Sequence, residues 1–233
     1  MHDLELLLMI NMENEVTNSL SAAIFDLDGT LIPHTSAEKT FFFYLLRTGN
    51  LSFLNMFQML SAIWTARGNF HDLARTNKRY LKNKSVKRLK DVASEYFEPQ
   101  IPKMVFPRMH EIIENHRKQN DLLLLLTGTL DLIAECFVRN LNLDGFKAGS
   151  LQINNNRYTG KIDGILPWGI GKLEILRELK NQFDFDRDKT TLYANSFADR
   201  YVMNAIENPI AVNPNSKLLT YAKKSGWKII YVD

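Results

Sequence analysis

The stretch Ala22-Ala23-Ile24-Phe25-Asp26-Leu27-Asp28-Gly29-Thr30 decides the fold of this chain. Its first four residues form a short apolar run that stops abruptly at two carboxylates and a glycine. That pattern is typical of a buried strand of a parallel sheet, which delivers polar groups to the loop after it. Open α/β sheets bind their ligands at the carboxyl ends of such strands, so we expect both aspartates in a binding crevice.

Strand and helix patterns alternate in the second half of the chain. Five consecutive leucines at 122–126 lie between Asp121 and Thr127-Gly128-Thr129, and we interpret them as a second buried strand. Beyond them, the patterns predict helices over 130–141, 171–180, 198–207 and 216–223, a hairpin over 146–162, and strands over 190–194, 210–212 and 228–232. This alternation predicts a parallel sheet with helices on both faces.

The segment between these two strands has no convincing strand pattern. Helices are predicted near 37–48, 51–66, 70–81, 85–97 and 103–118. We therefore expect an α/β core domain made of residues 1–34 and 121–233. An all-helical cap domain over residues 35–120 would interrupt this core after its first strand.

The composition is that of an ordinary globular protein. Of 233 residues, 45% are hydrophobic and 24% are charged, and the single cysteine excludes a disulfide framework. The net charge of +3 is too small to indicate a nucleic-acid partner. The apolar run at 6–10 is flanked by acids and is too short for a signal peptide or a membrane span. The sequence thus predicts a cytoplasmic protein and leaves its oligomeric state open.

Asp26 and Asp28 are two residues apart, so both can face one crevice if the chain turns after the strand. Two close carboxylates repel each other unless a cation lies between them, which invites a hard metal such as Mg²⁺. With the metal bound, one aspartate can attack phosphorus while the other shuttles a proton. An ordinary Asp-Gly turn is the alternative, but the buried strand before it favours the functional interpretation.

Later strand ends supply candidate partners for this chemistry. Thr127 ends the leucine run, where its hydroxyl could hold a phosphate oxygen at a helix start, or could simply cap that helix. Lys172 begins a helix, where a cation opposes the helix dipole and suggests an anionic neighbour; a solvated lysine is the alternative. Asn195 and Asp199 follow the strand 190–194 at the same edge of the sheet.

In this order the positions resemble the motifs of the haloacid dehalogenase-like (HAD) phosphohydrolases, specifically their phosphoserine-phosphatase-like branch. The signature Asp-x-Asp-Gly-Thr is matched by Asp26–Thr30, the hydroxyl of the second motif by Thr127 and the lysine of the third by Lys172. The stretch 156–161 also resembles the hairpin of that branch. The resemblance covers about residues 20–233, and only the helical insertion is weakly matched.

The resemblance implies a Mg²⁺-dependent phosphatase that hydrolyses a phosphomonoester through an aspartyl-phosphate intermediate. Asp26 would be the nucleophile and Asp28 the general acid and base. Thr127 and Lys172, the other implied catalytic residues, would neutralise charge on the transferring oxygens. The phosphate-binding residues that it implies are Gly29, Thr30, Thr127, Gly128 and Lys172. The implied Mg²⁺ ligands are the Asp26 carboxylate, the Asp28 main-chain carbonyl, Asn195 and Asp199.

The fourth motif departs from the family pattern. It usually begins with Gly-Asp and is Ala194-Asn195 here, so an amide replaces the expected carboxylate. An amide oxygen can still bind Mg²⁺, but the site loses one negative charge, and weaker metal affinity is expected. The alternative is a catalytically silent phospho-ligand-binding or regulatory protein of the same fold.

A second departure concerns the substrate. Phosphoserine phosphatases generally have a glutamate nine residues after the nucleophile, whereas this chain has Thr35 there and its nearest acid is Glu38. We therefore expect a phosphorylated small molecule or lipid-linked phosphate rather than phosphoserine. The apolar residues over 41–64 form either the core of the cap or a face for a lipid-like substrate. The basic run Arg75–Lys90 forms either a solvated face or a peripheral contact with an anionic membrane.

Overall fold

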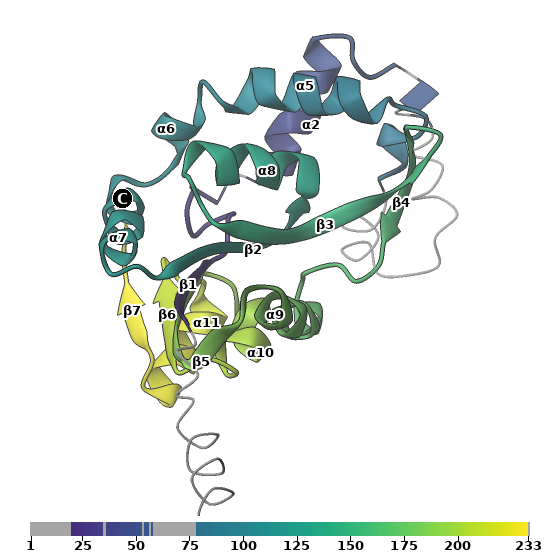
Figure 1. Cartoon of the computed structure of the whole chain (residues 1–233). Helices are drawn as coiled ribbons and strands as arrows, with labels where there is room; N and C mark the ends of the chain where they lie inside the picture. Colours follow the sequence, from purple (N-terminus) through teal and green to yellow (C-terminus); the bar gives the residue numbers. More distant parts are fainter. Residues whose placement is uncertain (1–19, 35, 53, 56, 58–77, 233) are drawn as a thin grey trace, which may run out of the picture.

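The computed structural model describes residues 20–34, 36–52, 54, 55, 57 and 78–232. Its centre is a seven-stranded sheet with the strand order β4-β3-β2-β1-β5-β6-β7 (Figure 1). The strands are β1 (Leu20–Phe25), β2 (Leu122–Leu130), β3 (Gly145–Asn154), β4 (Arg157–Asp163), β5 (Phe185–Ala194), β6 (Asn208–Val212) and β7 (Lys228–Ile230). All neighbouring pairs are parallel except the β3–β4 hairpin. The predicted parallel α/β sheet is confirmed, and β1 is its central strand.

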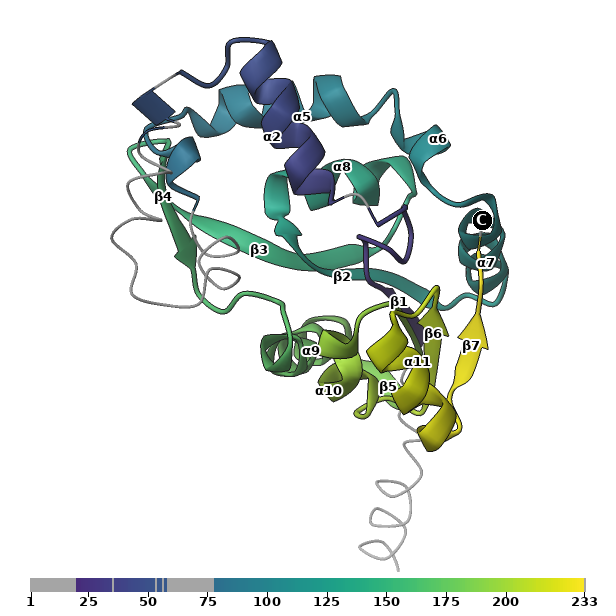
Figure 2. The same cartoon turned by 180° about the vertical axis from the view of Figure 1, so that it is seen from behind.

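Helices cover both faces of this sheet (Figures 1 and 2). On one face lie α2 (Ala37–Arg47), α5 (Val86–Phe97), α7 (Pro107–Lys118) and α8 (Asp131–Asn140). On the other face lie α9 (Ile170–Phe183), α10 (Arg200–Met203) and α11 (Ser216–Ser225). Helices α7 and α8 pack on the strands, whereas α5 packs on the outside of α8. None of the described helices is long and apolar enough to cross a membrane.

Side chains of β1 alternate between two buried apolar clusters. Ala23 and Phe25 belong to the cluster on the side of α7 and α8, and Ala22 and Ile24 belong to the cluster on the side of α9, α10 and α11. The leucines of β2 are divided in the same way. Because both faces of the sheet are buried, these strands need apolar residues at every position. This requirement explains the uninterrupted apolar runs in the sequence.

Between β1 and β2, every named element of the described residues is a helix. The set includes the 3₁₀ helix η1 (Arg79–Leu81) and the short helix α6 (Ile101–Met104) besides α2, α5 and α7. Most of the helix predicted over 51–66 and most of the one predicted over 70–81 lie outside the described residues. The Phe97 ring of α5 packs against Phe137 of α8, so this segment shares a hydrophobic core with one face of the sheet.

Several boundaries differ from the sequence prediction, and three of the differences have a clear physical or functional meaning. The helix predicted over 103–118 is broken between α6 and α7, because Pro107 disfavours helical geometry at Phe106. The helix predicted over 198–207 shortens to the 3₁₀ helix η2 (Phe197–Asp199) and α10, since the chain must turn into β6 at Asn208.

The third difference is at the end of β2. This strand continues to Leu130, and its pairing with β3 shifts register between Leu126 and Leu130. Thr127 was predicted at a helix start and instead lies in this strand irregularity, four residues before α8 begins at Asp131. The shift matters for the site, because regular pairing is interrupted where the polar side chains emerge.

Candidate active site

The carboxyl ends of β1, β2 and β5 and the start of α9 surround a cavity of about 300 Å³. These ends meet because β1 lies between β2 and β5 and runs parallel to both. The predicted site residues that line the cavity are Asp26, Asp28, Thr127, Gly128, Lys172, Asn195 and Asp199. Gly29 and Thr30 are also buried but are not part of its lining.

Asp26 follows β1, and its N–H donates to the Tyr193 carbonyl at 2.9 Å, which continues the pairing with β5. The Lys172 ammonium donates to Asp26 Oδ1 at 2.7 Å. The Thr30 hydroxyl makes only a long contact of 3.5 Å with Oδ2, so this oxygen of the carboxylate is held less tightly than Oδ1. Burial raises the pKa of Asp26 to about 6; Lys172 acts in the opposite direction, and Asp199 adds to the rise.

Lys172 joins two of the predicted site carboxylates. It lies in the first turn of α9, and its buried ammonium is 2.7 Å from Asp26 Oδ1 and 2.9 Å from Asp199 Oδ1. Burial alone would lower the pKa of Lys172, but the carboxylates of Asp199 and Asp26 outweigh burial and hold the pKa above its ordinary value. The cation at this helix start therefore has anionic neighbours and keeps its proton.

Asp28 is fixed by two short hydrogen bonds. The Ala37 N–H donates to Oδ1 and the Thr129 hydroxyl donates to Oδ2, both at 2.7 Å. Burial raises the pKa of Asp28, although both hydrogen bonds act in the opposite direction. Thr129 was not predicted as a site residue, and its N–H also donates to the Thr127 hydroxyl at 3.1 Å. The repeat Thr127-Gly128-Thr129 could have indicated Thr129, because side chains two positions apart on a strand point to the same face.

Asn195 is buried, with 2% of its surface exposed, and lies at the end of β5. Its Nδ2 is 3.1 Å from His34 Nε2, which leaves the amide oxygen as the atom that can bind a cation. Gly29 packs against this amide with φ +84°, and a Cβ there would lie 2.1 Å from Asn195 Nδ2. Both the backbone conformation and the space require glycine at position 29.

Residues from outside the predicted motifs complete the cavity. The buried Lys78 pairs with Glu38, and the Tyr80 hydroxyl donates to the same carboxylate at 2.9 Å. Leu166 and Trp168 contribute an apolar wall from the loop before α9. Sequence patterns missed these residues because they come from the insertion and from a loop, where no strand end marks a position.

The donor chemistry of the cavity fits a hard cation. Its lining includes four carboxylates, from Asp26, Asp28, Glu38 and Asp199, and two ammonium groups, from Lys78 and Lys172. A bound phosphoryl group would add further negative charge, which a divalent cation with oxygen ligands can balance. No His, Cys, Asp or Glu cluster of three or more in the described chain is arranged to hold a metal, consistent with an amide at position 195.

Two curated proteins illustrate what the chain is similar to. It is 24% identical over 220 residues to phosphoserine phosphatase SerB1 of Mycobacterium tuberculosis, which covers 90% of this chain and 70% of that protein. It is 27% identical over 228 residues to a histidinol-phosphatase of Neisseria meningitidis, which covers 89% of this chain and 97% of that protein. Both relatives are therefore similar along nearly the whole chain.

A solved structure from Bordetella pertussis, described as a protein of unknown function, has the same fold. It superposes with a TM-score of 0.78 at 22% identity and covers 91% of this chain and 99% of that one. The family model of haloacid dehalogenase-like hydrolases matches residues 23–204, a range that includes every predicted site residue. The chain therefore belongs to the haloacid dehalogenase-like hydrolases, and phosphatases are among its relatives.

Proposed function

We propose that this chain is a phosphatase that hydrolyses a small phosphomonoester through an aspartyl-phosphate on Asp26, with Mg²⁺ as its cofactor. One observation carries the proposal. Asp26, Asp28, Thr127 and Lys172 come from three separate parts of the chain and line the same cavity. A nucleophile, a proton carrier and two groups that neutralise anionic oxygens are the parts that phosphoryl transfer needs.

In the first step, the Asp26 carboxylate attacks phosphorus and the bond from phosphorus to the ester oxygen breaks. Asp28 gives its proton to that oxygen, so the leaving group departs as an alcohol. The raised pKa of Asp28 suits a group that must hold this proton. The Thr127 hydroxyl and the Lys172 ammonium contact the phosphoryl oxygens as charge moves onto them.

In the second step, Asp28 takes a proton from water, which attacks phosphorus and releases inorganic phosphate. The bond between Asp26 and phosphorus breaks, and both aspartates return to their initial states. The Asp26 carboxylate, the Asp28 carbonyl, the Asn195 amide oxygen and Asp199 would hold Mg²⁺. When bound, the ion supplies positive charge beside the transferring oxygens.

The insertion over residues 35–120 acts as the cap and selects the substrate. It contributes Glu38 and Lys78 to a cavity of only about 300 Å³, a volume that favours a small metabolite over a lipid-linked phosphate. Phosphoserine and histidinol phosphate, the substrates in the names of the two relatives, are both phosphate esters of amino alcohols. Glu38 is placed to bind the ammonium group of such a leaving group.

Hydrolysis of an aryl phosphate tests the proposal. Turnover should require Mg²⁺, stop on chelation and disappear in Asp26→Asn, while the matched surface variant Asp188→Asn keeps it. Borohydride treatment of acid-quenched enzyme should convert an aspartyl-phosphate at residue 26 to homoserine, which mass spectrometry of the peptide detects. Phosphate binding without turnover by the wild type would instead identify the silent phospho-ligand-binding protein.

A further inference from the structure

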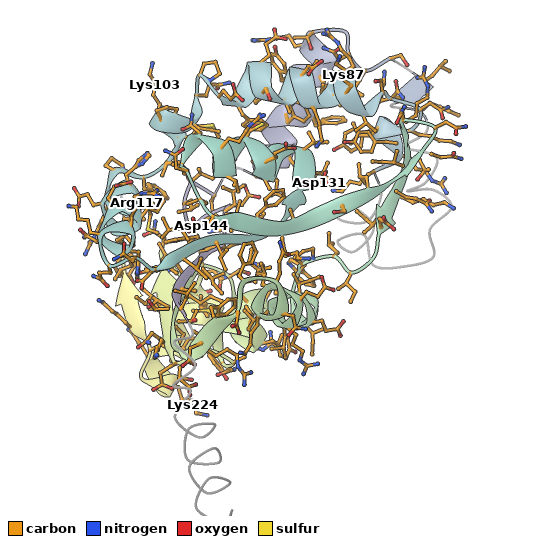
Figure 3. All side chains as sticks on the ribbon, in the orientation of Figure 1. Lys87, Lys103, Arg117, Asp131, Asp144 and Lys224 are labelled. Atoms are coloured by element: carbon orange, nitrogen blue, oxygen red, sulfur yellow. The ribbon has the colours of Figure 1, made fainter. Side chains whose placement is uncertain are left out.

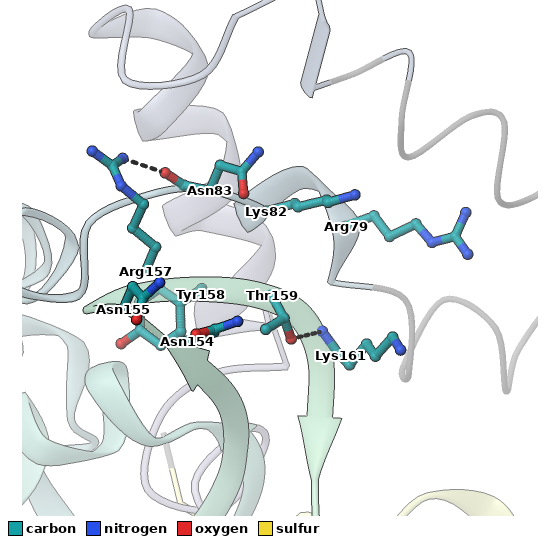
Figure 4. Close-up of a pocket in the computed structure, with 9 residues that line it drawn as sticks. All are labelled: Arg79, Lys82, Asn83, Asn154, Asn155, Arg157, Tyr158, Thr159 and Lys161. Carbon is teal, nitrogen blue, oxygen red and sulfur yellow. Dashed lines mark hydrogen bonds between the residues drawn. The ribbon is translucent and has the colours of Figure 1, made fainter.

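A second cavity, of about 580 Å³, lies between residues 79–83 and the β3–β4 hairpin (Figure 4). Its lining includes four cationic side chains, Arg79, Lys82, Arg157 and Lys161, and no acidic residue. The catalytic cavity has the opposite balance, with more carboxylates than cations. No residue lines both cavities, so the two are separate sites.

Three cations of this second cavity, Lys82, Arg157 and Lys161, are available to a ligand. Among the described residues, no carboxylate forms an ion pair with Lys82, Arg157 or Lys161. Lys82 and Lys161 extend to the same side of the cavity, whereas Arg157 lies at its other end and donates to the Asn83 carbonyl at 2.7 Å (Figure 4). Positive charge is thus spread along the length of the cavity.

Backbone hydrogen bonds hold the two walls together. The Asn83 N–H donates to the Tyr158 carbonyl at 2.8 Å, and the Tyr158 N–H donates to the Lys84 carbonyl at 3.0 Å. On the same strand, a Cβ at Gly160 would lie 2.9 Å from the Arg79 Cα, which shows how closely the walls approach. The backbone that carries the cations is therefore held in place before any ligand arrives.

Four cations of the basic run are divided between the two cavities and a surface ion pair. Within its described part, Lys78 lines the catalytic cavity and Lys90 pairs with Glu135, while Arg79 and Lys82 line the second cavity. The hairpin adds Arg157 and Lys161 from a distant part of the sequence. A concave group of cations suits a compact ligand better than the flat surface of a bilayer.

We propose that this cavity binds a small oligophosphate, meaning a soluble ligand with two or more linked phosphoryl groups. Cations at both ends of the cavity match several negative charges better than the single charge centre of one phosphate. Lysine ammoniums and an arginine guanidinium are the side chains that bind phosphoryl oxygens most strongly. The amides of Asn83, Asn154 and Asn155 supply neutral donors beside them.

Calorimetric titration with inorganic tripolyphosphate, without Mg²⁺, tests the proposal. The double variant Lys82→Ser/Lys161→Ser should bind tripolyphosphate at least about tenfold more weakly than the wild type, because two charge-assisted hydrogen bonds are lost. Lys223→Ser/Lys224→Ser removes the same charge from α11, at the opposite end of the molecule (Figures 1 and 3), and should bind like the wild type. Aryl phosphate turnover should be unchanged in both double variants, whose thermal unfolding verifies that they fold.

Four results would overturn the proposal. No binding by the wild type would exclude the site, and equal weakening in both double variants would mean only general attraction by net charge. Loss of binding in Lys172→Met but not in Lys82→Ser/Lys161→Ser would place the ligand in the catalytic cavity. Binding to phosphatidylserine-containing vesicles, with none to tripolyphosphate, would make this cavity a membrane contact.

Discussion

Asn195 sets the charge at the proposed metal-binding side of the cavity. It occupies the position where the family's fourth motif usually has a carboxylate, and its neutral amide lies between Gly29 and His34. The surrounding residues still provide the hard oxygen donors that Mg²⁺ prefers. The amide therefore changes the strength of the proposed metal site more than its shape.

Asn195→Asp should tighten Mg²⁺ binding. The added carboxylate increases the attraction for the cation with almost no change in side-chain volume, so the Mg²⁺ concentration at half-maximal activity should fall on the order of tenfold. Asn204→Asp adds the same charge at the exposed residue that follows α10 and should leave that concentration unchanged. An unchanged or higher value for Asn195→Asp would exclude Asn195 as a ligand.

Gly29→Ala should destabilise the protein and disturb Asn195. Alanine at φ +84° costs about 1–2 kcal/mol of backbone strain, and its Cβ would displace the Asn195 amide. Gly49→Ala is the matched control, because Gly49 has φ +70° and nothing within 4 Å of its Cβ position. Denaturant unfolding should show the backbone strain in both variants and a larger loss of stability in Gly29→Ala, and only Gly29→Ala should also weaken Mg²⁺-dependent turnover. Equal turnover in the two would show that the close contact is unimportant.

At the scale of elements, the junction between β2 and α8 carries a buried charge. Asp131 begins α8 and lies between this helix and β3 (Figure 3). Its Oδ1 accepts the Leu132 N–H at 2.7 Å. Burial raises the pKa of Asp131 above 3.8, although the Leu132 N–H and Lys90 act in the opposite direction. Folding therefore makes this side chain easier to protonate than it is in the unfolded chain.

Asp131→Asn should reduce the pH dependence of stability. Since the folded pKa is above the unfolded one, the stabilising contribution of Asp131 is complete below pH 3.8 and is lost as pH rises through the folded pKa. Relative to wild type, the variant should therefore gain stability as pH rises from about 4 and level off at higher pH. Urea unfolding of both proteins across this range measures the difference, with Asp188→Asn as an exposed control. A difference that is flat with pH, or falls, would contradict the prediction.

At the scale of the whole molecule, the described part of residues 35–120 contacts both the hydrophobic core and the catalytic cavity. It packs into the hydrophobic core on one face of the sheet and contributes the Glu38–Lys78 pair to the cavity. The residues proposed for phosphoryl transfer all lie outside residues 35–120, at strand ends and at the start of α9. Changes in this segment should therefore alter substrate choice more than chemistry.

Glu38→Gln should change which phosphate ester is preferred. Glutamine keeps an acceptor for Tyr80 and Lys78 but removes the charge that would bind a substrate ammonium. We expect kcat/KM for esters of amino alcohols to fall about tenfold, with little change for a neutral aryl phosphate. Glu98→Gln, on the surface of the same segment, should change neither. Equal losses on both kinds of ester would mean that Glu38 supports folding or catalysis instead.

Local sequence determined the central strand and the ends of its neighbours. The apolar run of β1 and the leucines of β2 predicted buried parallel strands, because a strand with two buried faces needs apolar residues throughout. Parallel strands bring their carboxyl ends to one edge, so the predicted residues at those ends could be expected together. Pro107 by itself also predicts a break in the helix, but the helical pattern over 103–118 continues across it and predicted one helix.

Only the tertiary structure decided which side chains from distant segments meet. Nothing local to Thr129 predicts its bond to Asp28, and nothing local to Lys78 places its ammonium in the catalytic cavity. The second cavity depends likewise on a hairpin that packs against residues 79–83. The hydrophobic periodicity of a helix or strand predicts which of its faces is buried. Packing across the whole chain decides which side chains contact that face. The sequence by itself therefore determined the sheet and the chemistry at its edge, and the folded structure decided what surrounds that edge.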